Sequence, residues 1–528
     1  MNKPIISKAF FNENILPVIS ALILATPFLF YSAGWLSFVC LVPFLYYLDY
    51  VSKAKSGKKY LLSIWAVGAI FFFVVAQWLI NTRPDNWAYI EGWQGGIGLL
   101  IIYLILVFFF SMQFLIFGFL YRKLKINLFS KWTFVVLPAV WVVSEFFRSV
   151  LFSIISYGPN GSIGPYWNFG VLGFGAGITP VGFCARIVGL FGLSFVVVVI
   201  NLAIFWLLHR RWKLPAVVLV VVAMLSLFGW LLFDKTNGSN MSVSIVQLPP
   251  TQDNSLATNY QSDLKSIMAT QSIKSDSVDL LLLPEYSEFF TAADPAAKEL
   301  TQSYLSTDGK AITSISGEDS ANQDGSNPSN DLVVYNHEGD ITARHQKQFL
   351  IPLGEFMPYI IEGLLRITGQ GEALELNKVT QNVKKGEEVE PPVMVASKTI
   401  GALACSGAIA PELYRSMVVQ GAEVLTNSAS LGTFTYAPLY HAQTRQMARF
   451  NAIANVRPYI QASTGAYSYA IDSNGKFLYR TTKTGLNHQF LTIQSNKTQT
   501  IFSKFGEWVV FVSLILVGTL LVRAYARN

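Results

Sequence analysis

Hydrophobic residues along this chain gather into long runs near its two ends and into short, alternating runs between them. A helix that crosses a membrane needs about 20 mostly apolar residues. The long runs therefore predict a membrane bundle of about eight spans. The predicted spans are Ile15–Ser32, Leu36–Leu48, Leu61–Ile80, Ile97–Leu120, Trp132–Phe152, Ile187–Leu208, Leu214–Phe233 and Trp508–Val522.

The polar middle of the chain has a different pattern. Short apolar runs such as SVSIVQL, VDLLLLPE and TIGALACSG are separated by polar turns and by helix-like stretches, one of them at 259–273. Strands that alternate with helices are typical of a layered α/β domain. We also expect a polar surface loop at 316–330. The predicted domains are a membrane bundle at 1–233, an α/β domain at 234–505, and a final helix with its tail at 506–528.

Composition and charge agree with a membrane protein. Of the 528 residues, 52% are hydrophobic and 13% are charged, whereas soluble domains carry about 25% charged residues. The net charge is +7, but the basic residues lie in short loops beside the spans, which indicates membrane orientation and not nucleic-acid binding. With eight spans, this pattern predicts cytoplasmic termini and an extracytoplasmic α/β domain. A signal peptide at the first run is the alternative, but a clear cleavage site is lacking.

Four residues of the α/β segment carry candidate chemistry. Cys405 ends a strand-like run and is followed by small residues, so it is a candidate nucleophile. Glu285 ends another apolar run and is a candidate base, because burial raises the pKa of a carboxyl group. Lys347 could stabilise an oxyanion, with Glu355 as a supporting residue. The remaining cysteines, Cys40 and Cys184, do not suggest a disulfide framework, and we expect neither a metal nor a cofactor.

Each of these residues also has a purely structural interpretation. A lone cysteine is more often a buried small hydrophobe, and the glutamates and the lysine could simply end strands at the surface. Glu145 and Arg148 lie three residues apart inside a predicted span and should share one helix face. Charges at membrane depth mark either a function or an internal ion pair, and here we expect a structural pair.

The order Glu285, Lys347, Cys405 resembles the Glu-Lys-Cys triad of the carbon–nitrogen hydrolase (nitrilase-like) superfamily. Further segments are similar to strands of that superfamily: VSIVQL at 243–248, GAEVLTNSAS at 421–430, RPYIQASTG at 457–465 and AIDSNGKF at 470–477. Together with the membrane spans, the pattern KxxLxPxGE at 347–355 resembles the apolipoprotein N-acyltransferase family, as do WVVSEFFRSVLFS at 141–153 and VGLFGLSFVVVVIN at 188–201. The resemblance covers nearly the whole chain.

This resemblance implies a fold, a reaction and its partners. The α/β domain would be an αββα sandwich on an eight-helix bundle in the bacterial cytoplasmic membrane. Cys405 would take an acyl chain from a phospholipid as a thioester and pass it to the N-terminal amine of a diacylglyceryl-cysteine apolipoprotein. No cofactor would be needed, and we expect a monomer. Phe356, Met357 and Tyr359, directly after Glu355, would belong to a lid that admits acyl chains from the bilayer.

The chain also departs from the family pattern. Where the family usually has Tyr-Glu after the nucleophile, this chain has Ser406 and Gly407. Two alternatives therefore stay open on the residues alone. One is a membrane-anchored amidase or nitrilase-like hydrolase, in which water is the final acceptor. The other is a diverged relative with weak catalysis, which the missing acidic side chain at Gly407 would favour.

Overall fold

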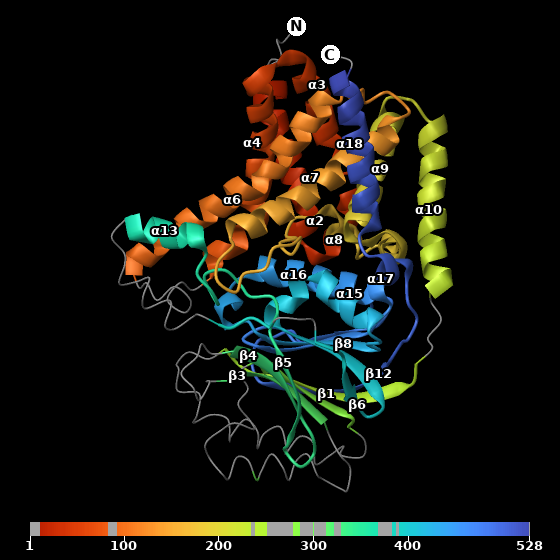
Figure 1. The fold of residues 1–528 in the computed structure, drawn as a ribbon. Coiled ribbons are helices and arrows are strands. Elements are labelled where there is room, and N and C mark those ends of the chain that lie inside the picture. The colour runs from red at the N-terminus through yellow and green to blue at the C-terminus, as the bar shows by residue number, and fades with distance from the viewer. Residues whose placement is uncertain are drawn as a thin grey trace.

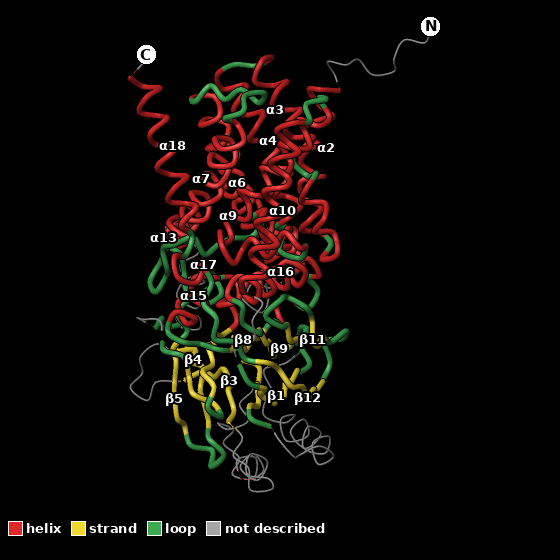
Figure 2. The backbone as a smooth tube through the Cα atoms, turned by 90° about the vertical axis from the view of Figure 1, so that its right-hand side faces the viewer, coloured by secondary structure: helices red, strands yellow, loops and turns green. Residues whose placement is uncertain are grey.

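The computed structural model of this chain consists of a helical bundle packed against a domain of two β-sheets (Figures 1 and 2). Helices fill one end of the molecule and strands the other. The structure describes residues 11–82, 92–233, 238–250, 278–285, 299, 313–320, 329–367, 383–386 and 390–526.

The bundle confirms the predicted membrane region. Within the described residues, seven helices are long and apolar enough to cross a membrane, or up to eight if a pair bent by 44° counts as one span. That pair corresponds to the short second span of the prediction. The helices are α2 (Leu16–Leu29), α3 (Val42–Ala54), α4 (Gly57–Val75), α6 (Gly92–Lys123), α7 (Thr133–Ile155), α8 (Leu172–Ala176), α9 (Ala185–Leu208), α10 (Lys213–Phe233) and α18 (Trp508–Ala526), with short helices η1 (Phe11–Ile15), η2 (Tyr31–Phe38), η3 (Gln77–Asn81) and η4 (Pro180–Cys184).

The two charges of α7 do not form the expected ion pair. Glu145 accepts hydrogen bonds from the backbone N–H of Leu172 at 3.0 Å and from the Trp141 indole at 2.9 Å. Arg148 donates to the Phe169 carbonyl oxygen at 2.7 Å. Both partners on the main chain belong to the irregular segment before and at the start of α8. Because buried backbone groups at membrane depth need hydrogen-bond partners, these charges hold that segment inside the bundle.

Helix α9 is broken near its start, at Gly189. This glycine has φ +74°, and a Cβ atom there would lie 2.7 Å from the Glu507 carboxylate. Glu507, just before α18, accepts from the backbone N–H of Leu190 at 2.7 Å and of Phe191 at 3.1 Å. The carboxylate thus caps the new helix start, where the first N–H groups have no partner within the helix.

The second domain is a sandwich of two six-stranded sheets. One has the order β12-β1-β2-β3-β4-β5 and the other β11-β10-β9-β8-β7-β6. The strands are β1 (Asn240–Gln247), β2 (Leu280–Glu285), β3 (Thr313–Ser320), β4 (Ser329–Tyr335), β5 (Ile341–Gln346), β6 (Val393–Val395), β7 (Lys398–Ala404), β8 (Val424–Ser430), β9 (Tyr459–Thr464), β10 (Tyr469–Ile471), β11 (Phe477–Arg480) and β12 (Asn487–Gln494).

Alternating residues of these strands supply two separate cores. In β7, Ile400, Ala402 and Ala404 belong to the core between the sheets, whereas Leu403 belongs to the core that continues into the bundle. This follows from the period of two along a strand. The second sheet is covered on its outer side by α15 (Pro411–Val419) and α16 (Pro438–Asn455). With the strands, these helices confirm the predicted layered α/β domain.

Two detailed predictions for this domain concerned a helix at 259–273 and a loop at 316–330. The helix expected at 259–273 lies outside the described residues. The loop expected over 316–330 is wrong at both ends, because residues 316–320 belong to β3 and residues 329–330 belong to β4, which pair antiparallel. Polar composition suggested a loop, but in these strands the ladder hydrogen bonds decide the conformation.

Helix α16 and Arg186 join the domain to the bundle. From α16, Gln443 donates to the Val75 carbonyl oxygen at 2.9 Å and Gln446 to the Pro27 carbonyl oxygen at 2.8 Å. Arg186 of α9 is fully buried and donates to carbonyl oxygens on both sides, including those of Gly229, Ile453 and Ser473. Polar contacts buried in this way fix the position of the sandwich domain relative to the membrane helices.

Candidate active site

Three strand ends bring the predicted residues Glu285, Lys347 and Cys405 together. Glu285 is the last residue of β2, Lys347 follows β5, and Cys405 follows β7. Glu285 and Lys347 are 1% and 5% exposed, and Cys405 is partly exposed. Because the strands belong to both sheets, the residues meet only when the sandwich is assembled.

Lys347 lies between two carboxylates. Its ammonium group is 3.1 Å from Oε1 of Glu285 and 2.5 Å from Oε1 of Glu355. The other oxygen of Glu355 accepts from the Ile351 backbone N–H at 2.7 Å. A buried ammonium group with two carboxylate partners is held in one position, and its charge is available to a neighbouring reacting oxygen.

Glu285 joins the two sheets through its carboxylate. Oε1 accepts from the Asn330 side chain at 2.5 Å as well as from Lys347, and Oε2 accepts from the Ser430 backbone N–H at 2.9 Å. Ser430 ends β8 in the opposite sheet. The carboxylate is therefore fixed from three directions beside the nucleophile. Asn330 and Ser430 carry no local motif that would have assigned them to this site from the sequence.

Cys405 occupies a tight turn directly after its strand. Its φ is +38°, a conformation that costs a non-glycine residue about 1–3 kcal/mol. The Sγ–H group donates to the Ser430 carbonyl oxygen at 3.6 Å, and, in addition to burial, the negative charge of Glu285 is close enough to raise the pKa of the thiol. Asn427 donates to the Cys405 carbonyl oxygen at 3.3 Å. The turn thus presents the sulfur to the carboxylate.

The packing of this turn explains why the residue at 407 is a glycine. A Cβ atom on Gly407 would lie 2.6 Å from the Cβ of Leu403, which is closer than carbon atoms can approach without a shift. Ser406, the other departure from the family pattern, donates its hydroxyl to the Phe349 carbonyl oxygen. This bond ties the nucleophile's turn to the segment that follows Lys347.

Burial and neighbouring charge set the protonation of the site. Burial, reinforced by the negative charge of Glu285, raises the pKa of the Cys405 thiol well above 9 although Lys347 opposes the shift. Burial also raises the pKa of the Glu355 carboxyl above 4.5, with Lys347 opposing and Glu285 adding to the shift. The thiol is therefore protonated at neutral pH, and a nucleophilic attack needs a base within reach.

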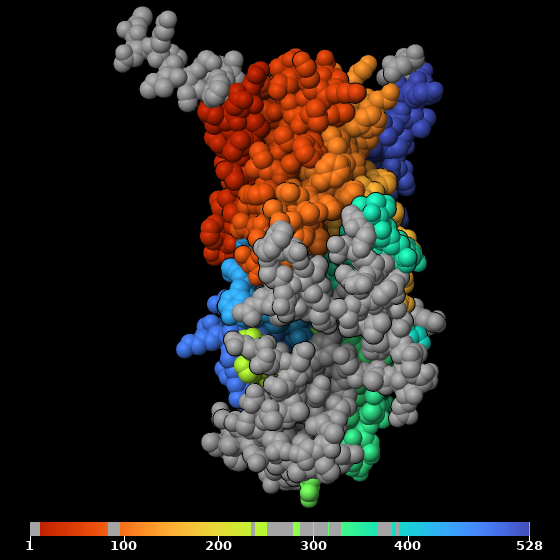
Figure 3. Space-filling view, turned by 90° about the vertical axis from the view of Figure 1, so that its left-hand side faces the viewer, coloured from red at the N-terminus to blue at the C-terminus, as the bar shows by residue number. Residues whose placement is uncertain are grey.

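The predicted lid residues divide into a buried base and an exposed helix. Phe356 and Met357 are 3% and 8% exposed, and they pack against Gly158, where a Cβ atom would lie 2.3 Å from the Met357 carbonyl oxygen. Tyr359 is 56% exposed and begins α13 (Tyr359–Ile367). The burial of Phe356 and Met357 agrees with a packed segment, whereas Tyr359 lies on an exposed helix. Figures 1 and 3 show α13 at the height of the bundle and not beside the sheets.

An aromatic cluster that sequence reasoning missed connects the site to the bundle. Tyr440 and Phe434 stack with ring centroids 3.9 Å apart, and Trp78 from η3 lies edge-on to both. Burial and the nearby Cys405 raise the pKa of Tyr440. Trp78 comes from a distant part of the chain, so only the assembled fold reveals this apolar wall beside the nucleophile.

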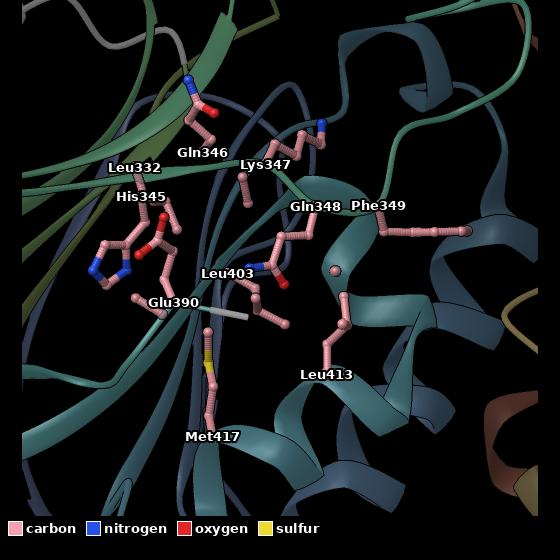
Figure 4. Close-up of a pocket in the computed structure, with 13 residues that line it drawn as sticks. Leu332, His345, Gln346, Lys347, Gln348, Phe349, Glu390, Leu403, Leu413 and Met417 are labelled. Carbon is pink, nitrogen blue, oxygen red and sulfur yellow. The ribbon is translucent and has the colours of Figure 1, made fainter. Parts of the chain in front are cut away.

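A small cavity lies on the other side of the Lys347 segment. Its volume open to water is about 20 Å³, enough for about one water molecule. His345 and Glu390 line one side, and the ammonium group of Lys347 points away from them (Figure 4). Cys405 does not line this cavity, which is too small for an acyl chain. Within the described residues, no group of three or more His, Cys, Asp or Glu side chains is placed to hold a metal ion.

Two family models match the chain one after the other. The apolipoprotein N-acyltransferase N-terminal domain matches residues 20–203, and the carbon-nitrogen hydrolase family matches residues 242–501. An apolipoprotein N-acyltransferase of Pasteurella multocida is 24% identical and aligns over 95% of this chain and 92% of its own length. One of Haemophilus influenzae is 24% identical over 90% of this chain and 89% of its own.

Two solved structures are similar to part of this chain. The carbon-nitrogen hydrolase of Helicobacter pylori has 16% identity and a TM-score of 0.35, covering 52% of this chain and 94% of its own. The NitFhit protein of C. elegans has 18% identity and a TM-score of 0.37, covering 53% of this chain and 64% of its own.

Proposed function

The chain belongs to the apolipoprotein N-acyltransferase family, and from that premise we propose that it moves an acyl chain from a phospholipid, through a thioester on Cys405, to the N-terminal amine of an apolipoprotein. The observation that carries this proposal is the convergence of Glu285, Lys347 and Cys405 from two sheets: Lys347 pairs with Glu285, and Ser430 bonds to both Glu285 and Cys405. The reaction is an acyl transfer that needs no redox step.

In the first half-reaction, the Glu285 carboxylate takes the proton from the Cys405 thiol. The thiolate attacks the carbonyl carbon of a phospholipid ester, and the carbonyl oxygen becomes an oxyanion beside the Lys347 ammonium group. When the tetrahedral intermediate collapses, the ester C–O bond breaks and the lysophospholipid oxygen receives the proton from Glu285. An acyl-thioester remains on Cys405.

In the second half-reaction, the amine of the diacylglyceryl-cysteine attacks the thioester carbonyl. Glu285 accepts a proton from the attacking nitrogen, and the same ammonium group of Lys347 stabilises the second oxyanion. Collapse breaks the C–S bond, forms the amide and returns the proton to Cys405. Splitting the transfer into two steps lets two lipid substrates use one site in turn.

Glu355 supports this mechanism by holding Lys347. With a carboxylate on each side, the ammonium group keeps its position in both half-reactions. The exposed apolar residues of α13, among them Tyr359 and Ile367, suit a lid that rests in the bilayer surface and admits acyl chains. Its buried base at Phe356 and Met357 would act as the hinge.

The hydrolase alternative is not favoured, because the family match extends over the membrane region as well as the hydrolase domain. The weak-relative alternative rested on Gly407. In the structure Gly407 is required by its close approach to Leu403, while the three chemical groups remain assembled. We therefore propose an active enzyme, which acts as a monomer in the bacterial cytoplasmic membrane with its catalytic domain on the extracytoplasmic side.

Acceptor competition tests the proposal. Purified protein loaded with an acyl chain from labelled phospholipid is mixed with a synthetic diacylglyceryl-cysteine peptide, and N-acyl peptide and free fatty acid are measured by mass spectrometry. We expect the peptide to receive most of the label, and no transfer by Cys405→Ala. A Cys40→Ala/Cys184→Ala variant, in which Cys405 is the only thiol, should transfer normally. Release of the label mainly as fatty acid in the presence of peptide would instead support a hydrolase.

A further inference from the structure

A second, larger cavity lies at the end of the bundle farthest from the sheets. It opens between the C-terminal end of α6, the start of α7 and the last turns of α18, and its volume is about 490 Å³. Helix α18 ends at that side of the molecule (Figures 1 and 2). The lining residues therefore lie far from Cys405, and the reaction proposed above does not use them.

Positive charge dominates the polar part of this cavity. Lys123, Lys125 and Arg523 line it, and its lining includes no aspartate or glutamate. Within the described part of the chain, no carboxylate lies within 4.0 Å of any of these three cationic groups. Unpaired cations around one cavity favour an anionic ligand, because its charge is attracted by all of them together.

The turn that follows Lys123 at the end of α6 and carries Lys125 has a defined shape. Lys125 has φ +50°, and its N–H donates to the Arg122 carbonyl oxygen at 3.0 Å. The next N–H, of Ile126, donates to the Tyr121 carbonyl oxygen at 3.2 Å. These bonds satisfy carbonyl groups at the end of α6 in the manner of a helix C-cap. The side chain of Lys125 thus projects from a fixed turn.

The cavity also has polar lining from Asn127, Ser130 and Thr133 and apolar walls, and it lies at the ends of the predicted spans. Its walls include Leu124, Val136 and Leu520. The helices α6, α7 and α18 all qualify as membrane spans, and the cavity lies where each of them ends. Trp132, which also lines the cavity, is 68% exposed, and tryptophan is common at a membrane–water interface. A ligand here would have a charged group near the surface and an apolar part directed along the helices.

We propose that this cavity binds the headgroup phosphate of an anionic phospholipid in the leaflet opposite the catalytic domain. The cations would contact the phosphate, and the apolar walls would contact the glycerol and the first carbons of the acyl chains. A cavity of this volume is of the size that small ligands occupy, roughly 300–1,000 Å³. The bound lipid would hold the end of α18 against α6 and α7.

Lipid binding by the purified full-length protein tests this proposal. All variants carry Cys405→Ala so that lipid is not consumed. Native mass spectrometry measures retention of phosphatidylglycerol against phosphatidylcholine, and thermal unfolding in detergent measures stabilisation by each. The test variant is Lys125→Gln/Arg523→Gln. The matched control is Lys58→Gln/Lys59→Gln, which removes two exposed lysines outside the cavity, near the same end of the bundle.

We expect the parent protein to prefer phosphatidylglycerol and the test variant to bind it about 30-fold more weakly, since each removed cation near a lipid surface weakens binding about fivefold. The control should retain the preference, and both variants should unfold at the parent's temperature without lipid. Equal loss in test and control variants, or an unchanged preference in the test variant, would overturn the proposal. So would inorganic phosphate alone reproducing the full stabilisation, because the ligand would then be a free anion and not a lipid.

Discussion

Replacing Glu285 with glutamine removes the proposed base and keeps its size. Three donors converge on the native carboxylate, from Asn330, Lys347 and the Ser430 backbone. An amide has only one acceptor oxygen, so at least one of these donors would face the NH₂ group. Loss of a hydrogen bond to a charged group costs about 1.5–3 kcal/mol, so we expect Glu285→Gln to fold with a lower unfolding temperature.

The expected effect on catalysis is much larger than the effect on stability. General-base catalysis typically contributes about 10²–10⁴-fold, and the thiol of Cys405 is protonated at neutral pH. Intact-protein mass spectrometry after mixing with phospholipid measures the rate of acyl-enzyme formation. In Glu285→Gln we expect this rate to decrease by about 10²–10⁴-fold. The control Glu338→Gln changes an exposed glutamate of the same domain and should leave the rate unchanged. A folded Glu285→Gln protein that acylates within about threefold of the native rate would refute the assignment.

Alkylation of Cys405 by iodoacetamide distinguishes two roles of Glu285: accepting the thiol proton as a base, and raising the pKa of the thiol by its negative charge. The negative charge of Glu285 raises the pKa of Cys405, so its removal should shift the alkylation profile to lower pH. The variant should therefore be more easily alkylated at pH 8 and yet acylate more slowly. If alkylation instead shifts to higher pH, Glu285 does not act on the thiol as described.

Three further predictions follow from other contacts. Gly407→Ala should destabilise the fold by about 1–3 kcal/mol, measured by thermal unfolding, and Leu403→Ala in the same chain should restore part of the loss; a neutral Gly407→Ala would contradict the packing. Arg186→Met should lower the free energy of unfolding by about 3 kcal/mol, because several buried carbonyl oxygens lose their donor. An unchanged unfolding temperature would contradict this. In the native protein the alkylation rate of Cys405 should keep rising through pH 9, about tenfold per unit, because its pKa is raised; a plateau below pH 8 would show an ordinary or lowered pKa.

Local sequence patterns were sufficient to predict the membrane spans and the three candidate catalytic residues. Long apolar runs identified the spans, and Glu285 and Cys405 each stand at the end of an apolar run that forms a strand, whereas Lys347 follows the polar strand β5. What these patterns lack is the partner from elsewhere in the chain. Asn330 and Ser430 reach Glu285 only through strand pairing and sheet packing, and neither has a distinctive sequence context.

The membrane region shows the same limit. Glu145 and Arg148 were recognised as buried charges, but their partners are backbone groups of an irregular segment, and no periodicity predicts such contacts. The break in α9 depends on a carboxylate from just before α18, Glu507. Phe356 was assigned to a lid because it follows the active-site motif, but its burial depends on the close approach of Gly158, which the sequence pattern does not reveal.

The central claim is that the sulfur of Cys405 receives the acyl chain. Peptide mapping by mass spectrometry, after incubation with a phospholipid carrying isotopically labelled acyl chains, tests it directly. We predict one labelled acyl group on the peptide that contains Cys405, released by neutral hydroxylamine as expected for a thioester. A folded protein that consumes the phospholipid while this thiol stays unmodified, or that carries the label at another residue, would contradict the account.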